Sequence, residues 1–145
     1  MISITDIEHG WATLHIGYCS FDVSYLTNLV GEIDWLLGLD KSNDEADCKK
    51  SYFEGEGQGD LTLISYLTYG NISDEDKKYD YILNIIWQRL YCSKLGDNGF
   101  AILKFPFKEF KEEWLELKEN IKENYIKNFV CPQDEEEYQE ALAEY

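Results

Sequence analysis

The segment YDYILNIIWQRLYC, residues 79–92, decides the fold class, because it is apolar on both alternations and rich in β-branched and aromatic residues. Residues of these types favour extended strands. A strand that is apolar on both sides belongs in the middle of a sheet, with both of its faces covered at least in part. The sequence therefore predicts a sheet with this strand near its centre.

Further strands are predicted on both sides of this segment. LTLISYLTY at residues 61–69 precedes it, behind a short strand that begins at Tyr52 and Phe53, and FAILKF at residues 100–105 follows it. The connections carry the glycine and polar residues that mark chain reversals. Four consecutive strands joined by turns predict an antiparallel meander.

The N-terminal region predicts one strand followed by one helix. WATLHIGY at residues 11–18 alternates, and its apolar side comprises Ala12, Leu14, Ile16 and Tyr18. An extended lead-in with Ile2, Ile4 and Ile7 either pairs across the turn at residues 9–10 or continues the same strand through a bulge, and the pattern leaves both open.

From Ser24 to about Leu39 the apolar residues recur at helical spacing, with Ser24 as the predicted N-cap. The predicted helical stripe comprises Leu26, Leu29, Val30, Ile33, Leu36 and Leu37. DKSNDEADCKKS at residues 40–51 is polar throughout and predicts a loop.

Two helices are predicted to close the chain. The first has an apolar stripe and a charged solvent side that includes Lys118. The stripe comprises Phe107, Phe110, Trp114, Leu117, Ile121, Tyr125 and Phe129. After Pro132, QDEEEYQEALAEY restarts a helix with acids in its first turn. The expected order is β-α-β-β-β-β-α-α, an α+β fold in which an antiparallel β-sheet meander packs with about three helices in a single domain over residues 1–145.

The net charge of −16 limits the classes of partner. Residues 1–72 carry twelve acids against three bases, and residues 73–145 carry seventeen against ten, so the acidity belongs to the whole chain. Such a surface repels nucleic-acid phosphates and anionic membranes and attracts cationic partners. We therefore expect no direct nucleic-acid binding and no membrane binding.

The N-terminus lacks the pattern of a signal peptide, and no two cysteines have redox or zinc spacing, which predicts a cytoplasmic protein with reduced thiols.

No motif predicts catalysis or a cofactor. The glycine-rich stretch FEGEGQGDL at residues 53–61 lacks a phosphate-loop register and carries acids that would repel phosphate. The acidic segments lack the ligand register of a calcium loop. His15 shares a strand face with Trp11 and Thr13 and is interpreted as a sheet residue. We expect no catalytic residue, no metal site and no cofactor, and the chain is interpreted as a binding protein.

The predicted binding surface is an acidic rim with aromatic anchors, formed where the turns of the meander meet at neighbouring edges. Its candidate residues are Asp44, Glu45, Asp47, Tyr52, Glu54, Glu56, Asp60, Tyr66, Tyr69, Asp74, Glu75 and Asp76. Solvated loops are the alternative interpretation of the same acids.

The chain resembles the small acidic immunity proteins of bacterial polymorphic toxin and contact-dependent growth inhibition systems. The resemblance lies in HGWATLHIG, in DVSYLTNLVGEIDWLLGL, in the glycine- and acid-rich FEGEGQGDLTLISYL and in the aromatic terminal helix. It implies a cognate basic protein toxin, in particular a nuclease effector, that the chain neutralises by covering its cationic surface.

Two other functions remain open from the sequence. A phage-type inhibitor that mimics nucleic acid would need acids spaced regularly like phosphates, and lysines interrupt the acids of the terminal helix at Lys108, Lys111, Lys118 and Lys122. The second open function is that of a small enzyme that uses dispersed carboxylates for catalysis. The sequence leaves the oligomeric state and the identity of the toxin open.

Overall fold

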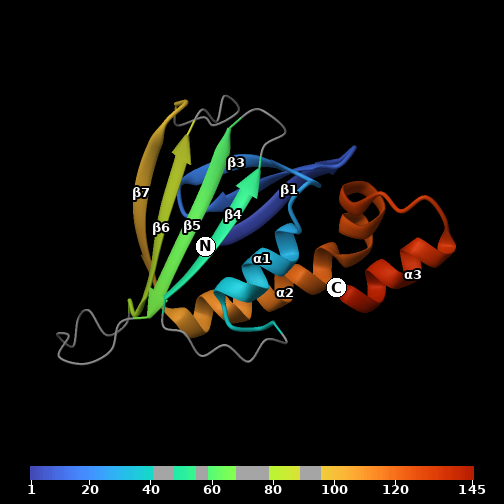
Figure 1. Cartoon of the computed structure of the whole chain (residues 1–145). Helices are drawn as coiled ribbons and strands as arrows, with labels where there is room; N and C mark the ends of the chain where they lie inside the picture. Colours follow the sequence, from blue (N-terminus) through green and yellow to red (C-terminus); the bar gives the residue numbers. More distant parts are fainter. Residues whose placement is uncertain (41–47, 55–58, 68–78, 89–95) are drawn as a thin grey trace.

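A computed structural model describes residues 1–40, 48–54, 59–67, 79–88 and 96–145. These residues form two antiparallel β-sheets and three α-helices, which confirms the predicted α+β fold (Figure 1). Among them, no helix combines the length and the apolar character needed to cross a membrane.

The first sheet has three strands in the order β1-β2-β3. Its strands are β1 (Ile2–Glu8), β2 (Trp11–Ile16) and β3 (Cys19–Ser24). β1 and β2 pair across a two-residue turn at His9 and Gly10, both with positive φ, and the register also shifts between Thr5 and Glu8. Of the two arrangements that the sequence left open, the structure therefore shows pairing across the turn, and the bulge lies within β1 instead of joining the lead-in to β2 as one strand.

The second sheet is the predicted four-stranded meander, in the order β4-β5-β6-β7. Its strands are β4 (Cys48–Glu54), β5 (Asp60–Leu67), β6 (Tyr81–Gln88) and β7 (Gly99–Phe105). β6 lies between β5 and β7, as predicted for the apolar segment at residues 79–92, of which residues 89–92 lie outside the described residues.

The core lies between the two sheets and under the helices. Alternate residues of the strands point inward, except beyond Thr5 in β1, and Leu14, Leu63 and Ile85 have no exposed surface. Across the sandwich, the rings of Phe21 on β3 and Trp87 on β6 lie 5.4 Å apart. Burial of these side chains supplies the main free energy that holds the sheets together.

The helices pack at the borders of this sandwich. They are α1 (Leu29–Leu36), α2 (Phe107–Tyr125), which continues into the π-helical turn η2 (Ile126–Val130), and α3 (Glu135–Glu144). α1 packs against β4, α2 against β1, and α3 against η2. The predicted stripe of α2 is confirmed, because Phe110, Trp114 and Tyr125 are buried.

The prediction for the region around Ser24 was wrong. Residues 19–24 form β3, with Ser24 as its last residue, and the hydroxyl of Ser24 donates to the Glu54 carbonyl at 3.3 Å. The N-cap of α1 is Asn28, whose Oδ1 accepts from Gly31 N at 3.1 Å. Tyr18, predicted on an apolar face, is 70% exposed, because the chain reverses at Gly17 with φ +58° before Tyr18 can enter a strand.

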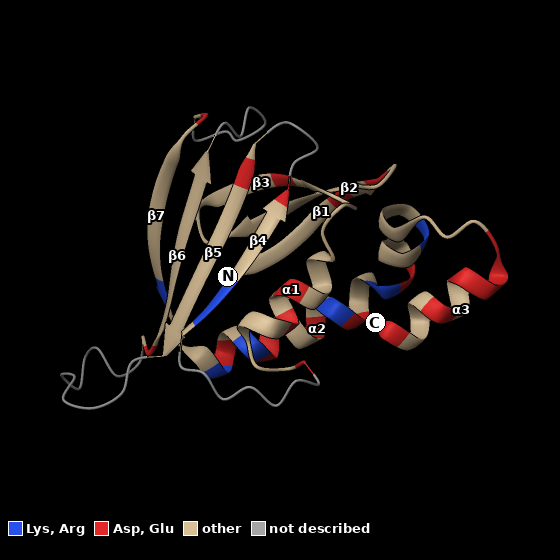
Figure 2. Cartoon of the chain, in the orientation of Figure 1, with Lys and Arg blue, Asp and Glu red and all other residues tan. Residues whose placement is uncertain are grey.

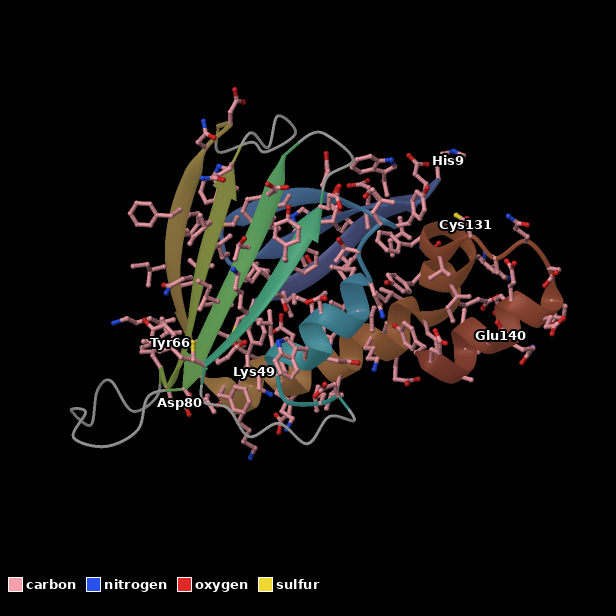
Figure 3. All side chains as sticks on the ribbon, viewed as in Figure 1. His9, Lys49, Tyr66, Asp80, Cys131 and Glu140 are labelled. Atoms are coloured by element: carbon pink, nitrogen blue, oxygen red, sulfur yellow. The ribbon has the colours of Figure 1, made fainter. Side chains whose placement is uncertain are left out.

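The predicted loop at residues 40–51 was also partly wrong, because β4 begins at Cys48. Residues 41–47 lie outside the described residues. Two of its inward residues are polar and contact α1: Ser51 Oγ donates to the Glu32 carbonyl at 3.1 Å, and Lys49 Nζ lies 4.7 Å from the ring centroid of Trp35. Figure 3 shows Lys49 beside α1. Polar residues that are satisfied by tertiary contacts hide the alternation of this strand.

Candidate functional site

A cavity of about 450 Å³ lies on the outward face of the three-stranded sheet. We call it the acidic cavity. It is lined by Asp6, Glu8, Trp11, Ala12, Thr13, His15, Ser20 and Asp22. Every lining residue belongs to β1, β2 or β3, so the sheet alone builds the site.

The bulge in β1 shapes one wall of this cavity. Asp6 has φ +52°, a left-handed conformation that aspartate tolerates better than most residues. Regular pairing ends at Thr5 and resumes where Glu8 pairs with Trp11. A bulge changes the direction of the side chains on the bulged strand, and here Asp6 and Glu8 both line the cavity.

A hydrogen-bonded series crosses the floor of the acidic cavity. Thr5 Oγ1 donates to Asp6 Oδ2 at 3.0 Å and therefore accepts from His15 Nε2, which lies 2.8 Å away. His15 Nδ1 then accepts from Ser20 Oγ at 2.7 Å in the neutral imidazole. His15 and Ser20 are directly opposed in the β2–β3 register, and these bonds hold the imidazole in one orientation.

Asp22 is held in a similar way, because Thr13 Oγ1 donates to Asp22 Oδ1 at 2.8 Å. Thr13 and Asp22 are also a directly opposed pair of the β2–β3 ladder. Asp6 and Asp22 therefore present carboxylates whose positions are fixed by neighbouring hydroxyl groups. Carboxylates held in place in advance lose less side-chain entropy when they bind a cation.

The surroundings of the cavity are negative. Residues 1–40 contain six acids and no lysine or arginine. Figure 2 shows acidic segments on β1 and β3 and no basic segment on β1, β2 or β3. The half-buried indole of Trp11 adds an aromatic wall. Carboxylates beside an indole face are the groups that bind an alkylammonium or a guanidinium ion.

The residues that line the cavity do not gather tightly enough for a metal centre. Within the described ranges, no group of three or more histidine, cysteine, aspartate or glutamate side chains could hold a metal ion. Three of the cysteines are described, and Cys19, Cys48 and Cys131 are free thiols.

The four described residues of the predicted rim lie on the other sheet. Tyr52, Glu54, Asp60 and Tyr66 all point outward from β4 and β5, and Glu54 and Asp60 are directly opposed. Tyr52 OH donates to Asp60 Oδ1 at 2.5 Å, and this hydrogen bond is the main reason that the pKa of Tyr52 is raised. Tyr66 lies at the opposite end of the same face, as Figure 3 shows.

The structure therefore brings three of the predicted residues together and places the fourth on the same face. The other predicted residues lie outside the described residues: Asp44, Glu45, Asp47, Glu56, Tyr69, Asp74, Glu75 and Asp76.

The acidic cavity was not among the sites predicted from the sequence. His15, Trp11 and Thr13 were placed on one strand face, but their partners Ser20 and Asp22 belong to β3, which was not predicted. The signal that could have found them is the alternation in CSFDVS at residues 19–24, where Cys19, Phe21 and Val23 are buried and Ser20 and Asp22 point outward.

A second cavity, of about 430 Å³, lies between the N-terminal end of α1, η2 and α3. Its walls mix aromatic and polar side chains, with Tyr125, Phe129 and Tyr145 among the aromatic ones and Asp34 and Glu144 as the acids. It has few charged groups, and it offers no comparable means of recognising a cation.

Comparisons of the chain with protein-family models, with curated proteins and with solved structures found no match.

Proposed function

We propose that the chain is a binding protein that recognises a basic protein partner and receives a lysine or arginine side chain of that partner in the acidic cavity. The observation that carries the proposal is the combination of Asp6, Glu8 and Asp22 with Trp11 in one cavity, on a surface that carries no lysine or arginine between residues 1 and 40.

Long-range electrostatic attraction brings the partner to the chain. A net charge of −16 attracts a basic partner and raises the rate of encounter. The cavity then adds short-range contacts, because a cation that enters it is partly desolvated and touches carboxylates and an aromatic ring. Cation recognition of this kind contributes both to orientation and to affinity.

The resemblance of the sequence to immunity proteins supports a toxin as the partner. A toxin that acts on nucleic acid needs a cationic surface, and a protein that covers this surface excludes the substrate. In this proposal the chain neutralises the toxin by occupying that surface, and no chemistry on the toxin is required.

The acidic cavity and the predicted rim around Glu54 and Asp60 are competing contact surfaces, because they lie on the outward faces of different sheets. The rim is less suited to a purely cationic partner. Its face also presents the basic side chains of Lys50 and Lys104. We therefore favour the cavity.

The experiment is a binding titration with the product of the neighbouring open reading frame, at several salt concentrations. One variant combines Asp6→Asn with Asp22→Asn, since asparagine also tolerates the conformation of Asp6. The matched variant combines Glu54→Gln with Asp60→Asn and removes the same amount of charge. We expect the cavity variant to lose affinity by about tenfold or more, which is ~1.4 kcal/mol, and the matched variant to change much less.

A larger loss in the matched variant would place the contact on the rim instead of the cavity. A neighbouring product that forms no salt-sensitive complex, and whose toxicity persists when the two are co-expressed, would contradict the proposed function as a whole.

A further inference from the structure

The outward face of the four-stranded sheet carries large apolar side chains that no described helix covers. Phe100 is 74% exposed, Ile102 57% and Tyr52 47%, and Ile86 is also exposed. α1 contacts this sheet on its inward side, where it accepts hydrogen bonds from Ser51 and Ser65. Exposed apolar side chains that gather on one face mark an interaction surface.

The strand register arranges this face in four rows. The first row is acidic and contains Glu54, Asp60 and Gln88. The second row contains Tyr52, Thr62, Ile86 and Phe100. The third row contains Lys50, Ile64, Asn84 and Ile102, and the fourth contains Cys48, Tyr66, Ile82 and Lys104.

The face is therefore polarised along the strands. Its acids lie in the first row, its lysines lie in the third and fourth rows, and its middle is mainly apolar. Figure 2 shows the same separation, with acidic segments at one end of β4 and β5 and basic segments at the other ends of β4 and β7.

A second copy of this chain fits such a surface. In a two-fold dimer the same patch meets itself. If the two-fold axis ran along the strands, the acidic row would lie over the acidic row of the other copy. If the axis lies between the faces and runs across the strands, the first row lies over the fourth and the second over the third.

We propose that this face is the interface of a homodimer with its two-fold axis across the strands. Phe100 of each copy lies over Ile102 of the other along the β7 edge of the two apolar middle rows, and Lys50 of each copy lies within one row of Glu54 on the other. An apolar centre with charged groups toward its ends is the usual composition of a homodimer interface. A purely basic partner is a poorer occupant, because Lys50 and Lys104 would repel it.

This proposal is independent of the proposed function. The acidic cavity lies on the other sheet and points away from this face, so both surfaces can be occupied in one assembly. A dimer built in this way would present two acidic cavities.

The first test is the molar mass in solution, measured by sedimentation velocity and by light scattering over a concentration series. We expect the unmodified chain to form a dimer and Phe100→Asp to shift the mass toward that of the monomer. Leu115→Asp is the matched control, because Leu115 on α2 is 43% exposed and lies outside the face. It should leave the dimer unchanged. Circular dichroism verifies that each variant is folded.

The second test concerns the direction of the axis. Glu54→Lys and Lys50→Glu should each weaken the dimer, because each places like charges together. The double variant restores opposite charges across the interface and should recover most of the dimer. A chain that is monomeric at every concentration, or a dimer that is insensitive to Phe100→Asp, would overturn the proposal. A double variant weaker than both single variants would overturn the proposed axis.

Discussion

Lys118 Nζ on α2 lies 2.7 Å from Asp34 Oδ2 on α1, while Trp114 Nε1 donates to the other oxygen of the same carboxylate at 2.8 Å. Asp34 is buried, and the side chain of Lys118 is only 18% exposed. Lys118 was predicted on the solvent side of its helix. It faces α1 instead, and the ion pair connects two helices that are more than seventy residues apart in the sequence.

Lys118→Met should destabilise the fold by about 3 kcal/mol, because it leaves the buried Asp34 carboxylate without its cation. The free energy of unfolding from urea titration measures this loss. Asp34→Asn with Lys118→Met removes both charges and keeps an acceptor for Trp114, so the double variant should be more stable than Lys118→Met alone. If the double variant and Lys118→Met had the same free energy of unfolding, the ion pair would contribute little to stability.

The free energy of unfolding should fall at high pH because of Tyr81. The pKa of Tyr81 is raised from 10.0 to about 12, and burial of the side chain is the main cause. A hydrogen bond with Ser65 acts in the opposite direction and lowers the pKa by less. Between these two values the unfolded chain loses the proton and the folded chain retains it, so stability falls as the pH rises. Two pKa units correspond to about 2–3 kcal/mol.

The measurement for Tyr81 is the free energy of unfolding at intervals from pH 9 to about pH 12. Tyr81→Phe should weaken the fall across this range, because phenylalanine has no proton to lose. An identical pH dependence in both proteins would contradict the assignment to Tyr81.

Gly99→Ala should destabilise the junction of β6 and β7. A Cβ at Gly99 would lie 2.4 Å from Cζ2 of Trp87, and the indole is held in place because its Nε1 donates to the Gly96 carbonyl at 3.0 Å. Overpacking of this kind costs about 1–3 kcal/mol. In a Trp87→Phe background the smaller ring leaves room, and a double-mutant cycle of unfolding free energies should show that most of the cost has disappeared.

Asn28→Ala should lower stability by about 1 kcal/mol, because α1 would lose the side-chain acceptor for Gly31 N. Asn28→Asp retains an acceptor at the N-cap and serves as the control. Thermal unfolding of the two variants distinguishes the effect of the cap from that of any substitution at this position.

The sequence predicted the elements whose periodicity is strong. The stripe of α2 and the central strand of the meander follow directly from the spacing of their apolar residues, and the structure confirms the stripe and a strand over Tyr81–Gln88. β3 was missed because its alternation in CSFDVS merges with the helical spacing that follows. β4 was placed too late because Lys49 and Ser51, which are buried against α1, look like loop residues in the sequence.

The candidate sites were harder to predict, because they depend on which strands lie side by side. Tyr52 and Asp60 could be grouped, since a single hairpin brings them together. His15 and Ser20 could not be paired without knowledge of β3. The polarity of the face around Phe100 depends on the register of four strands, which local periodicity does not determine.

The bulge in β1 divides this strand into two parts with different constraints. Ile2 and Ile4 are fixed by the core, and any change there alters the packing of the whole domain. Asp6 lies within the bulge and Glu8 directly follows it, and both line the acidic cavity instead. Mutation can therefore alter the residues that meet a partner without altering those that maintain the fold, so that a new specificity can evolve on an unchanged framework.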